Sequence, residues 1–194
     1  MKLERLLALE KQIRVIGFDD SPFQRKRGSQ VGVSGIVCRR TTFEGMVWGH
    51  IRQDGWNSTD VLLKMLVGKK FLPQLHVVLL DGIAFGGLNV VDLPRLSREL
   101  GLPCVTVMRR PPHWEKLEVA VRKLPKPEKR IALMKAAGPI YEEETFCFQV
   151  QGEEPEVIAA LLPELTSSGH VPECLRLAHL IGSAIVTGES SQRA

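Results

Sequence analysis

The chain has 194 residues, 44% of them hydrophobic and 25% charged, and its formal net charge is +4. This balance excludes an intrinsically disordered chain and is ordinary for a folded one. No apolar run approaches the roughly 20 residues that cross a bilayer, and charges occur throughout residues 1–14, which is unlike a secretory signal. We therefore expect one cytoplasmic domain over residues 1–194. The positive charge permits an acidic polymer as a partner without requiring one.

The first third of the chain predicts three consecutive strands. Residues 14–20 ("RVIGFDD") are rich in large apolar and β-branched side chains, and residues 31–40 and 43–52 have a similar character. The breaks between them are short and polar. Strands joined in this way pair as an antiparallel meander.

After residue 53 the pattern alternates between helices and strands. A helix is predicted after an N-cap at Asn57 or Ser58, and another, ended by Gly101, over residues 92–101. The near-continuous apolar runs at 75–82 and 102–110 are typical of strands buried on both faces. Helices follow at 113–124, 126–138, 154–166 and 172–186, with a possible further strand at 145–150.

This order predicts an α/β fold of the RNase H-like type. Its mixed sheet has an antiparallel three-strand meander followed by parallel strands, with helices on both faces. The first strand is expected in mid-sheet, beside the strand at 75–82. The four cysteines are too far apart for a Cys-x-x-Cys metal or redox pair, so we expect buried, reduced thiols.

Acidic residues end two of the predicted central strands. Asp19 and Asp20 close the first strand, and Asp81 closes the strand at 75–82. If these strands are parallel neighbours, their carboxylates meet at one sheet edge, where repulsion favours a shared hard divalent cation. Strand alternation puts Asp19 and Asp20 on opposite faces, and we favour Asp19 as the ligand. The alternatives are an Asx-type turn before Pro22 and an Asp-Gly turn after Asp81.

A third carboxylate would complete such a site. Asp60, at the start of the first predicted helix, is the main candidate, and Asp54, at the end of the third strand, is its rival. Asp92 has the position of an N-cap for the following helix, with a proline shortly after it.

The last predicted helix carries two further candidates. His179 is suited to moving a proton near the metal or to orienting the nucleophile; the alternative is a buried histidine bonded to the sheet. Arg176 lies three residues earlier on the same helical face, where it would pair with an active-site acid or form a structural salt bridge.

Four segments of the chain resemble the endonuclease dU family, from about residue 14 onwards. These segments are "VIGFDDSPF", "HVVLLDGIAFGGLNVVDL", "GLPCVTVMRRPP" and "PECLRLAHLIGSAIVTGES". That family is more distantly similar to endonuclease V, an RNase H-like, Mg-dependent nuclease that acts near deaminated bases. The resemblance places Asp19 and Asp81 on the two strand aspartates of endonuclease V. It places Asp60 on a helix-start glutamate and Arg109 on a lysine after the last core strand.

Two features of endonuclease V have no counterpart here. Its histidine shortly after the second aspartate is absent from "GIAFGGLN", and its aromatic wedge is not found. The resemblance thus implies the catalytic chemistry more directly than the recognition of a base.

The resemblance implies a Mg²⁺-dependent endonuclease, with Mn²⁺ as a substitute, that cuts DNA near a deaminated base such as deoxyuridine. In this reading Asp19, Asp81 and Asp60 hold the metal, His179 assists, and Arg109 stabilises the phosphate. Two alternatives stay open. One is a non-catalytic nucleic-acid-binding protein of the same fold, and the other is a hydrolase of a small phosphorylated metabolite.

Overall fold

The computed structural model describes residues 2–26 and 28–191. Its strands are β1 Arg14–Asp20, β2 Gln30–Arg39, β3 Thr42–Arg52, β4 Val77–Asp81, β5 Ala84–Phe85, β6 Asn89–Val90, β7 Cys104–Met108, β8 Tyr141–Glu142 and β9 Cys147–Gln151. Its α-helices are α1 Leu3–Ala8, α2 Ser58–Leu66, α3 Leu93–Leu100, α4 Trp114–Arg122, α5 Pro127–Ala136, α6 Pro155–Glu164 and α7 Glu173–Thr187, and a 3₁₀ turn, η1, spans Leu72–Gln74.

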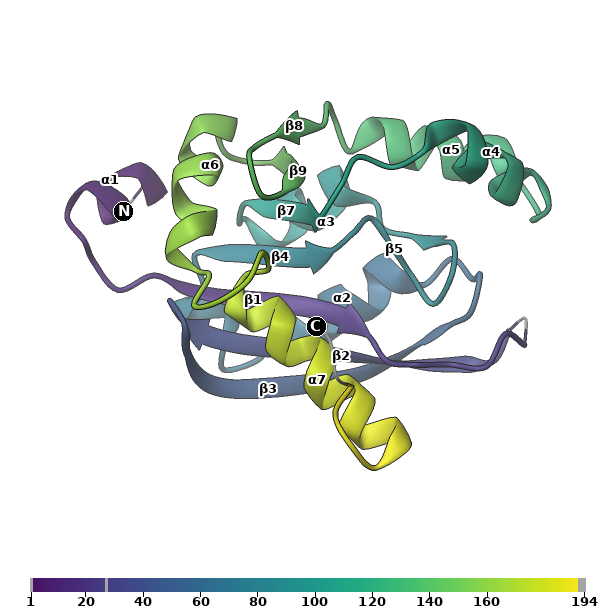
Figure 1. The fold of residues 1–194 in the computed structure, drawn as a ribbon, viewed down its shortest axis with the longest axis horizontal. Coiled ribbons are helices and arrows are strands. Elements are labelled where there is room, and N and C mark those ends of the chain that lie inside the picture. Colours follow the sequence, from purple (N-terminus) through teal and green to yellow (C-terminus); the bar gives the residue numbers. More distant parts are fainter. Residues whose placement is uncertain (1, 27, 192–194) are drawn as a thin grey trace.

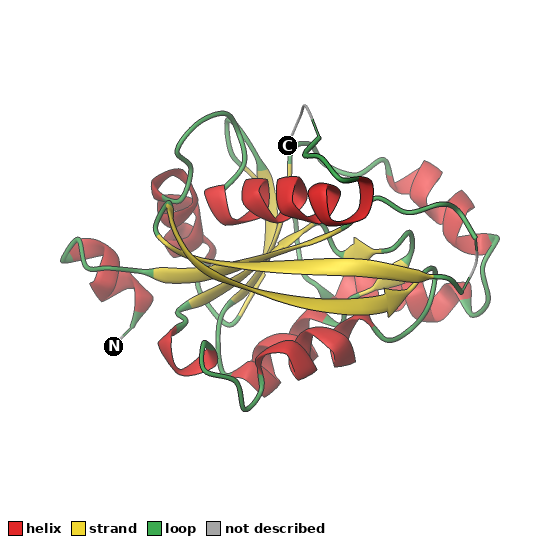
Figure 2. Cartoon of the chain, turned by 90° about the horizontal axis from the view of Figure 1, so that it is seen from below, coloured by secondary structure: helices red, strands yellow, loops and turns green. Residues whose placement is uncertain are grey.

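Seven of these strands form one mixed sheet, in the order β3-β2-β1-β4-β7-β9-β8. The first three strands are an antiparallel meander, β1 and β7 flank β4 in parallel, and β9 pairs antiparallel with β7. Helices lie on both faces of the sheet (Figures 1 and 2). The predicted RNase H-like fold is therefore confirmed, and β1 lies in mid-sheet beside β4 as expected.

The sheet separates two apolar cores, because strand side chains alternate between its faces. Val15 of β1 and Leu79 of β4 pack with α6 and α7 in one core. Phe18 of β1 and Leu80 of β4 belong to the other core, with α2 and α3. Full burial of each such side chain contributes about 1.5–3 kcal/mol, so this alternation fixes which face each following residue takes.

Helix α7 lies directly against β1, as Figure 1 shows in yellow over purple. The contact depends on Gly17: a β-carbon placed there would come within 2.7 Å of Cys174 Sγ and 2.8 Å of the Leu175 backbone nitrogen. Because a glycine stands at this point of β1, α7 approaches close enough to bring its polar residues to the end of the strand.

Several short elements were not predicted from the sequence. They include α1, the β5–β6 hairpin and β8, and the hairpin strands of two residues each are too short to give a periodic signal. The four cysteines are buried and free, as expected, and burial raises the pKa of Cys38 to about 12. Within residues 2–26 and 28–191, no helix has the length and apolar character needed to span a bilayer.

Candidate active site

Asp19 and Asp81 end adjacent parallel strands at the same level. The last paired residues of β1 and β4 are Phe18 and Leu80, and each acid is the next residue of its strand. Val15 and Leu79 face the α7 side of the sheet. Counting two residues at a time from them, Asp19 and Asp81 also belong to the α7 face.

Asp19 makes a direct contact with the last helix. His179 Nδ1 lies 2.8 Å from Asp19 Oδ2, which is a hydrogen-bond distance. The Asp19 side chain is 8% exposed and that of His179 is 36% exposed, so the pair has a buried acid and a histidine open to solvent. His179 is therefore bonded to an acid of the sheet, as in one of the two alternatives. It lies at the solvent-facing end of the site and is not buried, which agrees with the other alternative.

Asp20 turns to the opposite side, as strand alternation requires. Its Oδ2 accepts a hydrogen bond from the backbone N–H of Gly86, in the tight turn between β5 and β6. Gly86 has φ +54°, a left-handed conformation that glycine adopts at little cost. The turn thereby brings a backbone donor to the edge of the acidic site.

Neighbouring carboxylates raise the pKa of Asp19 and that of Asp20. Burial raises the pKa of Asp19 to about 8, and the charges of Asp81 and then Asp20 add to this effect. Burial also raises the pKa of Asp20 and that of Asp81, although the Asp81 side chain is itself exposed. The charges of His179 and Arg109 lower the pKa of Asp81 in the opposite direction.

Arg109 contributes its positive charge from the third parallel strand. It directly follows β7, whose Val107 pairs with Asp81. Val107 faces the α7 side, so Arg109, two residues later, belongs to the same face. The exposed guanidinium is therefore a fixed cation beside the acidic edge, where an anionic substrate would approach.

The donor set fits a hard divalent cation. Asp19, Asp20 and Asp81 supply only carboxylate oxygens, the ligand type that Mg²⁺ prefers, and their crowding disfavours full ionisation without a counter-charge. In this structure, however, Asp19 is turned to His179 and Asp20 to Gly86. Among the residues described, no three His, Cys, Asp or Glu side chains converge as a completed metal site.

Asp60, predicted as the third metal ligand, lies apart from this cluster in the structure. Its carboxylate pairs with Arg95 at 2.8 Å, and its side chain is 62% exposed. Asp60 contributes to none of the pKa shifts of the three strand acids. The first turn of α2 packs toward α3, so its acid meets an arginine of that helix instead.

The remaining candidates are also engaged elsewhere. Asp54 accepts the Leu88 N–H at 2.9 Å and so braces the β5–β6 turn. Asp92 is the N-cap of α3, as predicted, and accepts the Arg95 N–H at 3.0 Å. Arg176 forms a two-point salt bridge with Glu173, at 2.8 and 2.6 Å, which corresponds to the structural alternative.

Sequence reasoning missed Arg130, a fully buried arginine of α5. Its guanidinium donates to the backbone carbonyls of Asp54 (2.6 Å), Gly55 (3.1 Å) and Leu88. It thus joins the β3–α2 loop to the β5–β6 turn that carries Gly86. The charged stretch "KPEKR" is typical of a solvated helix, and only the neighbouring glycines, Gly86 and Gly87, pointed to this region.

The sequence is similar to an archaeal protein family over most of its length. Residues 11–186 match the family model described as "Endonuclease dU". A UPF0215 protein of Pyrococcus furiosus is 39% identical over 189 residues, which cover 95% of this chain and 97% of the relative. A UPF0215 protein of Methanosarcina barkeri is 35% identical over 191 residues, with 96% and 97% covered.

Solved structures show the same fold. A crystal structure of a protein of unknown function from Archaeoglobus fulgidus has a TM-score of 0.86 at 35% identity, covering 91% of this chain and 100% of that one. The catalytic domain of human endonuclease V has a TM-score of 0.62 at 15% identity, covering 97% and 88%. Ciona intestinalis endonuclease V, in complex with a DNA containing an inosine, has a TM-score of 0.55 at 16% identity, covering 91% and 90%.

Proposed function

This chain belongs to the endonuclease dU family, and on that premise we propose that it is a metal-dependent endonuclease acting on DNA near a deaminated base such as deoxyuridine. One observation carries the proposal. Asp19 and Asp81 end adjacent parallel strands at one level and on one face, with His179 hydrogen-bonded to Asp19. The apolar runs in the sequence predicted that both strands end in acids, and the register between β1 and β4 brings these two acids together.

Asp19, Asp20 and Asp81 would hold Mg²⁺, with Mn²⁺ as a substitute. Such an ion, when bound, supplies a Lewis acid for the phosphate and lowers the pKa of a coordinated water. Asp20 takes the part that the sequence assigned to Asp60.

The other residues would handle protons and charge. His179 shares a proton with Asp19 and is partly open to solvent, which suits it to accept a proton from, or return one to, the reacting oxygens. Arg109 offers a fixed guanidinium to the phosphate, where charge develops during hydrolysis. Asp81 and Arg109 are exposed and His179 is partly exposed, so this side of the cluster faces solvent.

The choice of DNA is supported by the fold and by charge. The Ciona intestinalis endonuclease V noted above is a complex with a 24-mer DNA containing an inosine, a nucleoside with a deaminated base, followed by a ribo-adenosine. The net charge of +4 suits a polyanion. The substrate class is therefore proposed by analogy with a protein of the same fold.

A nicking assay tests the proposal. Single strands containing uracil, hypoxanthine or only normal bases are incubated with Mg²⁺, Mn²⁺ or EDTA, and products are sized on a denaturing gel. We expect metal-dependent nicking by the unmodified protein, none by Asp81→Asn, and near-normal nicking by the matched control Asp60→Asn. Nicking by Asp81→Asn would point to a contaminating nuclease, and no nicking by the unmodified protein would refute the proposal.

A non-catalytic DNA-binding protein is the second candidate. It is favoured by one observation, the absence of a completed metal-ligand group among the residues described. Titration calorimetry with Mg²⁺ and Mn²⁺ separates the two. Binding that Asp81→Asn abolishes supports the nuclease, whereas DNA binding without metal binding supports the second candidate.

A further inference from the structure

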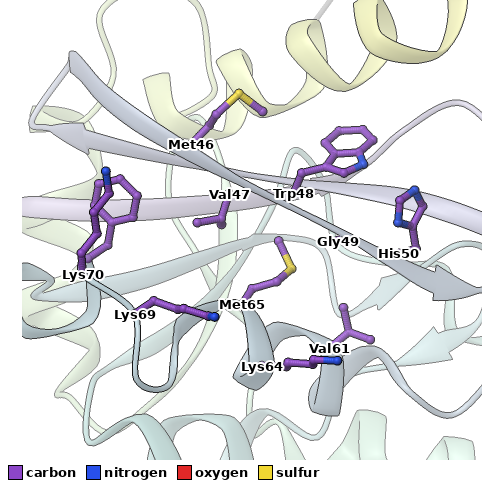
Figure 3. A pocket seen from close by; sticks show the side chains of 11 residues that line it. Met46, Val47, Trp48, Gly49, His50, Val61, Lys64, Met65, Lys69 and Lys70 are labelled. Carbon is purple, nitrogen blue, oxygen red and sulfur yellow. The ribbon is translucent and has the colours of Figure 1, made fainter.

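The sheet ends on one side at β3, whose outer edge pairs with no other strand in the seven-stranded sheet. A hollow of about 650 Å³ lies along this strand and α2. Figure 3 shows Met46 and Trp48 pointing from β3 toward one side, and Val47 toward the α2 side, where Met65 and Lys64 lie. The hollow therefore wraps around an open strand edge.

A second hollow, of about 470 Å³, continues the first toward the segment that follows β1. The two share Trp48 and His50 among their lining residues. The second is also lined by Pro22 and Phe23, which come after Asp20 and Ser21 in the chain, and by Ile185 near the end of α7. The two hollows form one path, here called the β3 groove, from the carboxyl end of β1 to the far side of β3.

The charged side chains that line the β3 groove are all basic. Four lysines line it: Lys26 in the second hollow, and Lys64, Lys69 and Lys70 in the first. No aspartate or glutamate is among the described residues that line either hollow. The whole chain has 22 acidic residues against 26 basic ones, so a groove with no acid departs from its average surface.

Aromatic rings stand between these lysines. Trp48 is half-buried and meets His50 edge-on, with ring centroids 6.0 Å apart. Lys70 Nζ lies 4.8 Å from the centre of the Phe71 ring. Alternating cations and aromatic faces are what an unpaired strand needs, since its phosphates take the charge and its bases stack on the rings. A duplex keeps its bases stacked inside and would use only the charges.

We propose that the β3 groove binds a single-stranded nucleic-acid segment that leads away from the acidic site. This inference rests on the proposed function and adds to it the form of the substrate, a strand with several unpaired nucleotides beside the cleavage point. The lysines contact its backbone, and Trp48 and Phe71 offer stacking faces. The path begins at Pro22, two residues after Asp20, so a strand held there would pass near the end of β1 that carries the acids.

A second copy of the chain is the other occupant that an open strand edge could take. Pairing of β3 with its own copy would be isologous, with the same patch on both subunits. The groove lysines would then crowd against the groove lysines of the partner, without acids in the groove to neutralise them. Charge therefore favours a polyanion over self-association.

Fluorescence anisotropy with labelled oligonucleotides tests the proposal. A 20-nucleotide single strand and the corresponding duplex are titrated with the unmodified protein and with a Lys64→Gln/Lys69→Gln/Lys70→Gln variant, at several salt concentrations. The control variant, Lys11→Gln/Lys116→Gln/Lys123→Gln, removes the same charge from other exposed positions. We expect the groove variant to bind the single strand at least 10-fold more weakly. Its salt slope should fall by about 2, since each phosphate contact on a single strand contributes roughly 0.7.

The outcomes separate this proposal from the nuclease. Equal loss in the groove and control variants, or tighter binding of the duplex, would overturn the β3 groove even if nicking is observed. Weakened single-strand binding by the groove variant alone would support the groove even if no nicking occurs. Sedimentation velocity completes the set: a stable dimer of the unmodified protein that the groove variant strengthens would assign the edge to a second copy and overturn the proposal.

Discussion

His179 Nδ1 and Asp19 Oδ2 are 2.8 Å apart, although 160 positions separate the two residues in the chain. The contact exists because α7 lies against β1 over Gly17, which has no side chain to hold the helix away. It places a proton-carrying group on the most buried of the three acids. Several measurable consequences follow from this arrangement.

Replacing His179 with glutamine should separate catalysis from metal binding. The carboxylates remain, so the rise in melting temperature caused by Mg²⁺ should persist, whereas the nicking rate should fall by about 10²–10⁴-fold as general acid–base assistance is lost. Thermal scanning and a single-turnover assay measure the two effects. The matched control is His170→Gln, at an exposed position. Unchanged nicking by His179→Gln would remove this residue from the mechanism.

Metal-free protein should lose stability as the pH rises from about 4 to about 8. Burial and the two neighbouring acids raise the pKa of Asp19 to about 8, so the folded state holds a proton that the unfolded state has released. Each proton held only in the folded state makes the free energy of unfolding fall by at most about 1.4 kcal/mol per pH unit. Urea unfolding in EDTA checks this slope.

Two changes should each weaken this dependence of the free energy of unfolding on pH. Asp19→Asn removes the titrating group, and saturating Mg²⁺ replaces the proton with a cation that favours the ionised carboxylates. A metal-free stability that rises between pH 5 and pH 8 would contradict the crowding of the three acids.

Asp20 and Asp60 should differ in their effect on metal affinity. Asp20→Asn removes charge from the cluster, and we expect Mg²⁺ affinity to fall by roughly 10–100-fold, as is typical when a group supporting a metal site is lost. Asp60→Asn breaks only an exposed ion pair with Arg95, worth about 0–1 kcal/mol in stability. Titration calorimetry compares the two. Equal losses of Mg²⁺ affinity in the two variants would show that Asp60 also supports the metal site.

Arg130→Met should destabilise the protein strongly. It leaves the carbonyls of Asp54, Gly55 and Leu88 without their donor in a buried place, at a cost of about 2–5 kcal/mol. The control is Lys129→Met, an exposed neighbour whose Nζ lies 5.3 Å from the centre of the Trp56 ring, a contact worth about 0.5–1 kcal/mol. Urea midpoints at pH 7 measure both. Similar urea midpoints for the two variants would show that the hydrogen bonds of Arg130 to the two loops contribute little to stability.

Gly17→Ala should lower both stability and activity. The added carbon would meet Cys174 Sγ at 2.7 Å and the backbone of α7, an overpacking that costs about 1–3 kcal/mol. Because the helix must shift, His179 should lose its position relative to Asp19, and nicking should fall even below the melting temperature. Full activity with lowered stability would show that the helix returns to its place.

The sequence by itself determined the antiparallel meander, the place of β1 beside β4 and the strands that end in acids. Long apolar runs such as residues 75–82 have a clear physical cause, since a strand buried on both faces needs apolar side chains throughout. The N-cap role of Asp92 was predictable for a similar reason, because its contacts lie within three residues of it.

Only the tertiary structure decided which acids meet and what they touch. Asp60 and Asp20 are equally acidic in the sequence, but α2 carries Asp60 to Arg95, while β1 carries Asp20 to Gly86. Arg130 looks solvated in the sequence and is buried in the fold. Local patterns fix strands and caps because their interactions are local; the site depends on the packing of α7, the β5–β6 turn and α5, whose contacts join residues far apart in the chain.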